Sequence, residues 1–388
     1  MIKSFRFLCR WAVFGMRWVL WAAAVVVIAI VALRVVFPWL ASMEPFSRWG
    51  VFEAKEHTTV ITNREEIVIR DDDRLDRIAR NMQNSVVLVS AGQAAADASA
   101  NETITGVVVS NDGLVVVPNT ADGVSNAPRD SYRVMAFDGT VFSADVFARD
   151  AFLDVMFLKI SEGNFSPAAF ANSDDFGAGR KVVALEGMDA RNRNRIVPGT
   201  LLAFDPHESI TPQVLASSEK HQGVFEASFL SDVSEGAAVL SYGGELMGVL
   251  GKKTVGSEEV TYVLGANDIR ESLDRTVADP ERSGVFFGAS YTPISPLVAE
   301  RYDLAASEGA WLAFPGRPSG IVTLFGSPAQ EAGLRYGDII LSANDVPVSA
   351  HAPLANILHA FSPEDVVSLR VLRNGEEIVL EAILSGRE

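Results

Sequence analysis

An uninterrupted apolar run from Trp18 to Leu33 is the feature that most limits how this chain can fold. The apolar character continues past Arg34, a residue whose long side chain can reach the membrane interface from near the end of a buried helix. About 20 apolar residues span the hydrocarbon core of a bilayer. Tryptophans near both ends of the segment fit the interfacial belts of membrane proteins. The sequence therefore predicts one transmembrane helix over residues 18–40.

Charge is distributed asymmetrically about this run. Residues 1–40 contain five basic residues and no acidic one, so the rest of the chain must carry a charge of −21 to give the net charge of −16. The positive-inside rule then places the basic residues 1–17 in the cytoplasm and the acidic body outside the cell membrane. Such an acidic body argues against nucleic-acid binding, because phosphate contacts need clustered Lys or Arg.

A cleaved signal peptide and a buried core helix are the two alternatives to a single-pass anchor. Signal peptides usually have an apolar region of about 7–15 residues and a small-residue cleavage site. The run here is longer, and Leu40-Ala41-Ser42-Met43 is a poor cleavage site. A buried core helix of this length without polar residues is rare. The only cysteine is Cys9, so the body has no thiol, which suits an oxidising compartment without requiring one.

After the predicted anchor, the chain first has the pattern of a stalk and then that of a strand-rich domain. Residues 41–73 are expected to form a stalk, and Asp71-Asp72-Asp73 is a helix-start signal followed by apolar residues at helical spacing. Over residues 74–275, short β-branched runs alternate with Asn/Asp-Gly turns, a pattern typical of a sandwich or barrel. This segment is long enough for two small barrels in succession.

The C-terminal part has a mixed α and β pattern. A polar linker over residues 276–283 leads into residues 284–388, which begin with the apolar strand Val285-Phe286-Phe287. A glycine-punctuated stretch over residues 326–341 and an apolar helix follow. A final hairpin is predicted to turn at Asn374-Gly375.

Five stretches of the body carry a family resemblance. They are Gly106-Val107-Val108-Val109 with the following Asp112-Gly113-Leu114, then residues 150–160, then Asn172-Ser173-Asp174 with the following Val182 to Leu185, then Gly244 to Val249, and finally residues 326–341, which are the most specific. These stretches resemble the HtrA/Deg family, with the anchor placed as in its DegS-like branch. The resemblance covers roughly residues 75–388. It implies an all-β trypsin-like double β-barrel plus an α+β PDZ domain, preceded by one transmembrane helix.

The catalytic base of that family has no counterpart here. Its strand ends in Thr-Asn-x-His, whereas this chain reads Pro118-Asn119-Thr120-Ala121-Asp122 without any histidine, and we take Thr120 as the residue in place of the histidine. A threonine hydroxyl cannot accept a proton from serine near pH 7. Asp154 matches the triad aspartate, but it has no histidine to orient. We expect Asp154 to be a partly buried carboxylate bonded to backbone N–H groups or to Thr120.

The nucleophile loop also departs from the family pattern, Gly-Asn-Ser-Gly-Gly. Counting back from Gly244 places Glu235 at the serine position, and a slip of one residue places Ser234 there. Either way Val233 or Asp232 replaces the first glycine, whose N–H forms half of the oxyanion hole. Losing one such donor costs about 10²–10³ in rate. An unconventional pair of Ser234 with His221 is the minor alternative.

A PDZ domain binds an extended C-terminal peptide as an added strand, and backbone N–H groups hold the terminal carboxylate. The family's carboxylate-binding loop reads apolar-apolar-Gly-apolar, and glycine lets the backbone turn its N–H groups toward an anion. In this chain the corresponding residues are Phe286-Phe287-Gly288-Ala289. The alternative is that Phe286 and Phe287 only pack the core. The predicted peptide-binding residues are Phe286, Phe287, Gly288 and Ala289 of the loop, and Leu354 and Leu358 of the facing helix.

The favoured hypothesis is a membrane-anchored extracytoplasmic pseudoprotease that binds C-terminal or extended peptides and has a scaffold or regulatory role in protein quality control. An active serine endopeptidase with a non-standard site is the alternative. A structural subunit of a homo-trimer is a third, since family members form trimers near the start of the protease domain, where Phe46, Trp49 and Phe52 are apolar enough to contribute. No cofactor is expected, because the Cys/His spacing is wrong for zinc and no phosphate-binding loop occurs.

Overall fold

A computed structural model of the chain describes most of the body and a short piece of the N-terminal segment. Thr120 and the three aromatic residues at 46, 49 and 52 lie outside the described part. The described residues are 21–32, 34, 71–91, 103–119, 128, 131–163, 165–188, 194–205, 215–255, 258–280 and 284–386.

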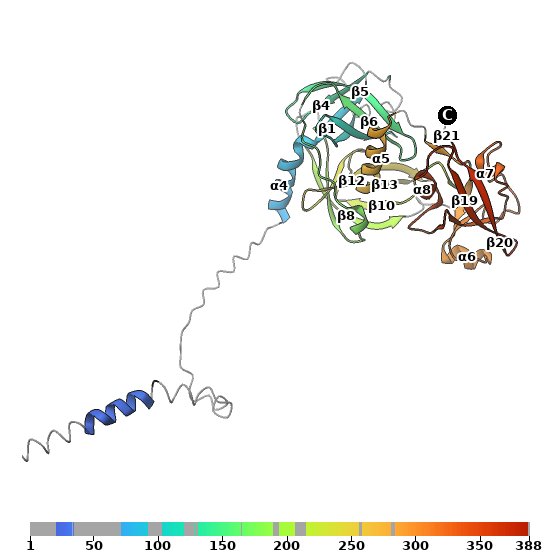
Figure 1. Cartoon of the computed structure of the whole chain (residues 1–388). Coiled ribbons are helices and arrows are strands. Elements are labelled where there is room, and N and C mark those ends of the chain that lie inside the picture. Colours follow the sequence, from blue (N-terminus) through green and yellow to red (C-terminus); the bar gives the residue numbers. More distant parts are fainter. Residues whose placement is uncertain are drawn as a thin grey trace, which may run out of the picture. The chain divides into compact units, whose positions relative to one another are not determined.

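The chain forms two compact units, residues 1–68 and 69–388, each of which is described by itself. In the first unit residues 21–31 are helical, and their apolar side chains are exposed, as in Trp21 and Ile28 (blue helix in Figure 1). Within the described ranges, no helix is both long enough and apolar enough to cross a membrane. The rest of the predicted 18–40 segment lies outside those ranges.

The second unit begins with α4 (Asp71–Met82) and a short 3-10 turn that lead into a closed barrel of six antiparallel strands. Its β-branched and apolar residues point alternately into the barrel and toward the neighbouring barrel, so almost none is exposed. The strand order is β1-β2-β3-β6-β5-β4. The strands are β1 (Val86–Ala91), β2 (Thr103–Val108), β3 (Leu114–Pro118), β4 (Tyr132–Met135), β5 (Val141–Asp150) and β6 (Val155–Ile160).

A second closed six-stranded barrel follows, in the order β10-β13-β12-β11-β7-β8. One apolar cluster lies between the two barrels and includes residues of both, such as Val116 and Leu240. Helix α5 (Ala266–Ala278) buries Ile269 in that cluster. The strands are β7 (Lys181–Leu185), β8 (Ile196–Asp205), β10 (Val224–Phe229), β11 (Ala238–Ser241), β12 (Leu246–Val255) and β13 (Glu258–Gly265), and a 3-10 turn, η4 (Ser173–Asp175), precedes them.

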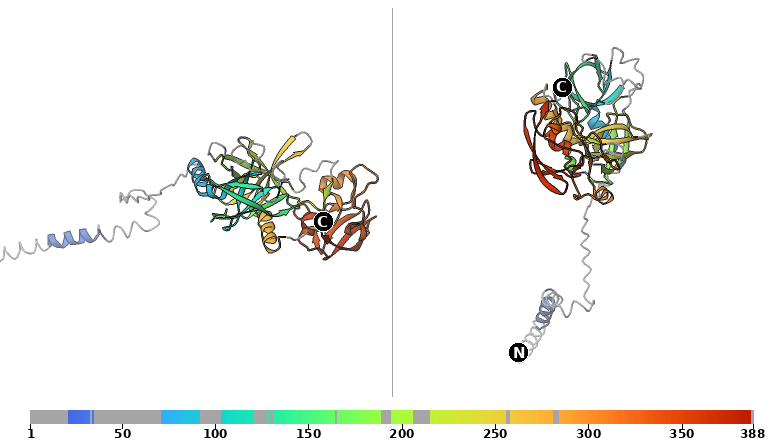
Figure 2. Two further views of the ribbon diagram at one scale, coloured as in Figure 1. Left: turned by 90° about the horizontal axis from the view of Figure 1, so that it is seen from above. Right: turned by 90° about the vertical axis from the view of Figure 1, so that its right-hand side faces the viewer.

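The C-terminal domain (orange to red in Figures 1 and 2) has its own core around Phe287, Ile340 and Leu369. Its main sheet runs β20-β19-β17-β16-β15, and β18 pairs with β17. The elements are β14 (Val285–Phe286), β15 (Ser290–Pro293), α6 (Pro296–Tyr302), β16 (Ala310–Trp311), α7 (Pro328–Glu331), β17 (Ile339–Ala343), β18 (Val346–Pro347), α8 (Leu354–His359), β19 (Val366–Arg373), β20 (Glu376–Ile383) and β21 (Ser385–Gly386). The expected double barrel followed by a PDZ domain is confirmed.

Two local features of the C-terminal domain follow directly from its sequence. The predicted hairpin forms between β19 and β20, and Asn374 and Gly375 both have positive φ (53° and 86°), as a tight hairpin turn requires. Asp338, which is 1% exposed, receives bonds from Nε and Nη2 of Arg373 at 2.8 and 2.7 Å. This paired geometry compensates the cost of burying the carboxylate.

A seventh strand joins the C-terminal sheet from outside the sequence of that domain. This strand, β9 (Ala216–Ser217), belongs to the segment that connects β8 and β10 of the second barrel. It pairs with β15, which lies at the edge of the C-terminal sheet. The second barrel and the PDZ domain are therefore joined by backbone hydrogen bonding as well as by the covalent chain.

Candidate active site and peptide groove

Asp154 lies at the end of the turn between β5 and β6, in a left-handed backbone conformation with φ of 53°. Its carbonyl accepts a hydrogen bond from the N–H of Asn119 at 2.7 Å. Its carboxylate is bonded by Lys220 Nζ, at 2.5 and 2.6 Å from the two oxygens. The expected partners of the carboxylate were backbone N–H groups or Thr120. Lys220 is a further partner that was not expected, because no sequence spacing connects it with Asp154, and Thr120 lies outside the described residues.

The loop at the nucleophile position is built around Gly236. Its φ is +83°, and a Cβ at this position would lie 1.9 Å from the carbonyl oxygen of Thr105, so only glycine fits. Val233 is buried in the core of the second barrel, whereas Ser234 is exposed and Glu235 is partly buried. The carbonyl of Glu235 accepts from the N–H of Thr105 at 3.3 Å. The second barrel's loop is thus fixed against β2 of the first.

The backbone N–H of Ser234 is hydrogen-bonded to a side-chain carboxylate. The Ser234 N–H donates to Oε1 of Glu186 at 2.7 Å, and Glu186 is only 7% exposed. In a trypsin-like protease the nucleophile's own N–H is one of the two oxyanion-hole donors. If Ser234 takes the nucleophile position, a negative charge already fills half of that hole. An oxyanion developing on a substrate would then be repelled rather than stabilised.

Charged side chains hold the same loop from both sides. Arg195 is within 3.4 Å of Glu186, and its Nη2 donates to the Ser231 hydroxyl at 2.8 Å and to the Asp232 carbonyl. Lys252 bonds the Asp232 carboxylate at 2.8 Å. This bond from Lys252 holds the pKa of Asp232 below its usual range. The loop is therefore held in place by ion pairs and hydrogen bonds from Arg195 and Lys252, which serine-protease catalysis does not require.

His221 is directed away from the nucleophile loop. Its Nε2 lies 2.9 Å from the carbonyl oxygen of Gly223 and 3.7 Å from Oδ2 of Asp268, and the ring is packed edge-on against Phe152. Burial raises the pKa of Asp268. Among the described contacts of His221, none is to Ser234, so nothing in the described part of the chain supports a pair of these two residues.

The predicted peptide-binding residues come together in the C-terminal domain. Phe287, Ala289, Leu354 and Leu358 are buried in one apolar cluster. Gly288 has φ of +79°, and a Cβ there would lie 2.4 Å from Cβ of Ser327, so the loop needs glycine at this point. Phe286 is half-buried and pairs with β21.

The carboxylate-binding loop already holds an anion. The N–H groups of Phe287 and Gly288 both donate to Oε1 of Glu219, at 3.1 and 2.8 Å. Glu219 lies two residues after β9, the strand that pairs with β15. Sequence reasoning missed Glu219, since nothing in Leu215 to Glu219 distinguishes the segment from an ordinary polar loop.

Two family models match separate parts of the chain. A trypsin-like peptidase domain matches residues 104–249, and a PDZ domain matches residues 319–384. The chain is HtrA/DegP-like, with a trypsin-like serine-protease fold followed by a C-terminal PDZ domain. These matches agree with the two closed barrels and the C-terminal sheet described above.

Curated relatives of this HtrA-like chain include bacterial proteases. It is 25% identical over 285 residues to a DegP-like protein of Chlamydia muridarum, named as a probable periplasmic serine endoprotease, with 71% of this chain and 52% of the relative covered. It is 23% identical over 267 residues to the serine protease Do-like HtrA of Bacillus subtilis, with 66% and 58% covered. The chain therefore spans little more than half the length of these relatives.

Solved structures show the same fold at low identity. The HtrA-type protease AlgW with a tripeptide matches with a TM-score of 0.62 and 19% identity, covering 81% of this chain and 97% of that one. A serine endoprotease of Yersinia pestis matches with a TM-score of 0.55 and 19% identity, covering 81% and 98%.

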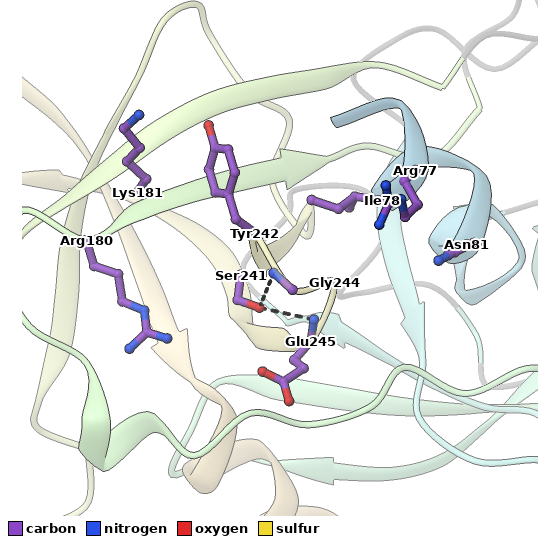
Figure 3. Close-up of a pocket in the computed structure, with 10 residues that line it drawn as sticks. Arg77, Ile78, Asn81, Arg180, Lys181, Ser241, Tyr242, Gly244 and Glu245 are labelled. Atoms are coloured by element: carbon purple, nitrogen blue, oxygen red, sulfur yellow. Dashed lines mark hydrogen bonds between the residues drawn. The ribbon is translucent and has the colours of Figure 1, made fainter. Parts of the chain in front are cut away.

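A separate cleft of about 750 Å³ lies between α4 and the turn that joins β11 to β12 in the HtrA-like chain (Figure 3). Ser241 organises this turn, because its hydroxyl accepts from the N–H groups of Gly243 and Glu245 at 3.1 and 3.3 Å. None of the predicted site residues lines the cleft, and no group of metal-binding side chains occurs in the described part of the chain. The lining residues are Arg77, Ile78, Asn81, Arg180, Lys181, Ser241, Tyr242, Gly243, Gly244 and Glu245.

Proposed function

We propose that this chain is a membrane-anchored, extracytoplasmic pseudoprotease of the DegS-like kind, which binds C-terminal peptides of other proteins through its PDZ domain. Its role is then that of a scaffold or regulator in protein quality control. The observation that carries the loss of catalysis is the bond from the Ser234 N–H to Glu186 at 2.7 Å. It places a carboxylate where a working enzyme needs an empty donor.

The state of Asp154 supports the same proposal. A triad aspartate orients a histidine and stabilises the imidazolium that forms. Here both carboxylate oxygens are bonded by Nζ of Lys220, so a lysine stands where a working triad has its histidine. The sequence adds the replacement of the base by Thr120.

Peptide binding is supported by the left-handed Gly288 and by the two N–H groups of the loop that converge on one carboxylate oxygen. Solved structures of the similar protease AlgW contain a tripeptide or a decapeptide. Backbone donors converging in this manner are what a PDZ domain uses to hold a terminal carboxylate.

An active serine endopeptidase is the alternative function, because Ser234 is exposed and the curated relatives are named as proteases. A casein-cleavage assay with the full-length chain and its Ser234→Ala variant separates the two. The proposal requires no cleavage above the background of buffer. Reproducible cleavage that disappears in Ser234→Ala would establish the endopeptidase.

Binding is tested with arrays of random decapeptides, made both with free C-terminal carboxylates and as C-terminal amides. The proposal requires carboxylate-dependent binding that Gly288→Val abolishes, because a side chain there collides with Ser327 and displaces the donors. Gly326→Ala is the matched control in the same domain, since its φ is also positive and a Cβ there meets nothing within 4 Å. Binding that is equal for acids and amides would contradict the proposal.

Assembly into a homo-trimer is part of the same proposal and rests on the family resemblance. Sedimentation velocity of the purified chain tests it. A monomer at micromolar concentration would remove the trimer and leave the peptide-binding function in place.

A further inference from the structure

The PDZ groove of this chain lies between β15 and α8, and the loop Phe286 to Ala289 closes one end of it. A peptide that binds such a groove adds an antiparallel strand to its edge, brings an anion to the loop and is buried between the strand and the helix. Residues Leu215 to Glu219 of the protease-fold domain meet each of these requirements in turn.

The first requirement is strand addition. Ala216 and Ser217 pair antiparallel with Tyr291 and Ser290 of β15. The N–H of Ser218 extends the pairing by donating to the Ala289 carbonyl at 3.0 Å. The segment therefore runs in the direction that carries its C-terminal end toward the loop.

The second requirement is an anion at the loop. Glu219 Oε1 accepts from the N–H groups of Phe287 and Gly288, and the Ser218 hydroxyl accepts from the N–H of Ala289 at 2.9 Å. Three successive backbone donors of the carboxylate-binding loop are thus used by two adjacent residues of one segment. The side-chain carboxylate of Glu219 takes the place that a terminal carboxylate would occupy.

The third requirement is burial against both walls of the groove. Ala216 is 7% exposed and packs in the same apolar cluster as Leu354 and Leu358. The segment is attached to the helical wall just beyond Glu219, where Gln222 exchanges two hydrogen bonds with the Asn356 side chain, at 3.0 and 2.7 Å. The segment therefore contacts both walls of the groove, β15 through strand pairing and α8 through Asn356.

We propose that Leu215 to Glu219 is an internal ligand of the PDZ domain, and that a free C-terminal peptide binds only by displacing it. The chemical class of the competitor is an extended peptide whose terminal carboxylate replaces that of Glu219. Since the internal ligand is tethered, it competes at a high effective concentration and weakens the apparent affinity for every outside peptide. The competitor's identity rests on the proposed peptide-binding function, whereas occupation of the groove is carried by the contacts above.

A disulfide between positions 217 and 290 tests the occupation. Directly opposed residues of antiparallel strands have Cα atoms about 4.5–5.5 Å apart, which is within the range for a disulfide. The full-length chain carrying Ser217→Cys, Ser290→Cys and Cys9→Ser is expected to form this bond under mild oxidation. Chains with only one of the two introduced thiols are the control for cross-linking between molecules.

The competition is tested by peptide affinity, with the free-carboxylate decapeptide array and its strongest binder as probes. Glu219→Ala is expected to tighten binding about 10-fold or more, because the internal ligand loses its charge-assisted bonds. Glu308→Ala, which removes an exposed carboxylate of the same domain, should leave the affinity unchanged. The oxidised disulfide variant should not bind, and reduction should restore binding.

The outcomes separate the inference from the proposed function. Equal affinity of the wild type, Glu219→Ala and the oxidised variant, or failure of the 217–290 disulfide to form, overturns the internal ligand and leaves peptide binding intact. Absence of binding by every variant, including reduced Glu219→Ala, overturns the peptide-binding function and the competition with it.

Discussion

The ammonium group of Lys220 lies 2.5 and 2.6 Å from the two carboxylate oxygens of Asp154. Lys220 directly follows Glu219, whose own carboxylate is held by the PDZ loop at Gly288. One short segment therefore contacts the triad-like aspartate of the first barrel and the peptide groove of the C-terminal domain. In the proposed pseudoprotease, the bond from Lys220 takes the place of the hydrogen bond from histidine that a working triad has.

Lys220→Met is expected to lower the free energy of unfolding by less than about 1 kcal/mol, because the pair is half-exposed and surface ion pairs contribute little. It should create no casein cleavage, since no base is supplied. Urea unfolding followed by circular dichroism measures the first effect. Lys159→Met, which breaks a comparable pair with Asp112, is the control. Casein cleavage by Lys220→Met would contradict the proposed loss of catalysis.

Gly236→Ala is expected to destabilise the chain by at least about 2 kcal/mol more than Gly244→Ala. Both glycines have positive φ, at +83° and +89°, so both substitutions carry similar backbone strain. Only at Gly236 does the new Cβ meet a backbone atom, the carbonyl oxygen of Thr105 at 1.9 Å. Urea unfolding of the two variants gives the difference. Equal losses would show that the loop moves freely away from β2.

Arg373→Met should cost about 3–5 kcal/mol, because it leaves the buried carboxylate of Asp338 without its partner. Arg370→Met, on the same strand, should cost no more than about 1 kcal/mol, since its pair with Glu377 is exposed and 3.9 Å long. Fluorescence of Trp311, the only tryptophan after residue 49, reports unfolding of this domain. Similar losses of unfolding free energy for the two variants would contradict the stabilising role given to the Arg373–Asp338 pair.

Asp268→Asn is expected to change the pH dependence of stability. Burial raises the pKa of Asp268, so the folded state holds the proton more tightly than the unfolded chain. The resulting contribution to the free energy of unfolding is fully present below the unfolded-state pKa of about 3.9, and it is lost as the pH rises through the folded-state pKa. The variant should therefore gain stability relative to the wild type between about pH 4 and pH 7. The exposed Asp274→Asn, on the same helix, should show no such trend in urea unfolding at the two pH values.

Much of the fold follows from local patterns that need no partner. The β-branched strand β3 is buried along its whole length, as its composition predicts, and Asn374-Gly375 forms the expected hairpin turn. The loop Phe286 to Ala289 carries its carboxylate-binding geometry in its own sequence, because glycine at 288 permits the left-handed turn.

The contacts between distant segments at the candidate active site cannot be predicted from the local sequence. Lys220 meets Asp154, and Glu186 meets the N–H of Ser234, only because folding brings distant segments together. Likewise Glu219 has a role only when β9 pairs with β15. The sequence predicts the loss of catalytic groups, but it gives no sign of the charged side chains that contact Asp154 and the Ser234 N–H.

The proposed loss of catalysis is tested most directly by labelling the purified full-length chain with a fluorophosphonate, followed by intact-mass and peptide mass spectrometry. We expect no phosphonylated serine, because no histidine contacts Ser234 in the described part of the chain and its N–H, the proposed oxyanion donor, is bonded to the Glu186 carboxylate. Near-stoichiometric modification of Ser234 that is absent after denaturation would contradict this expectation and establish an active serine hydrolase.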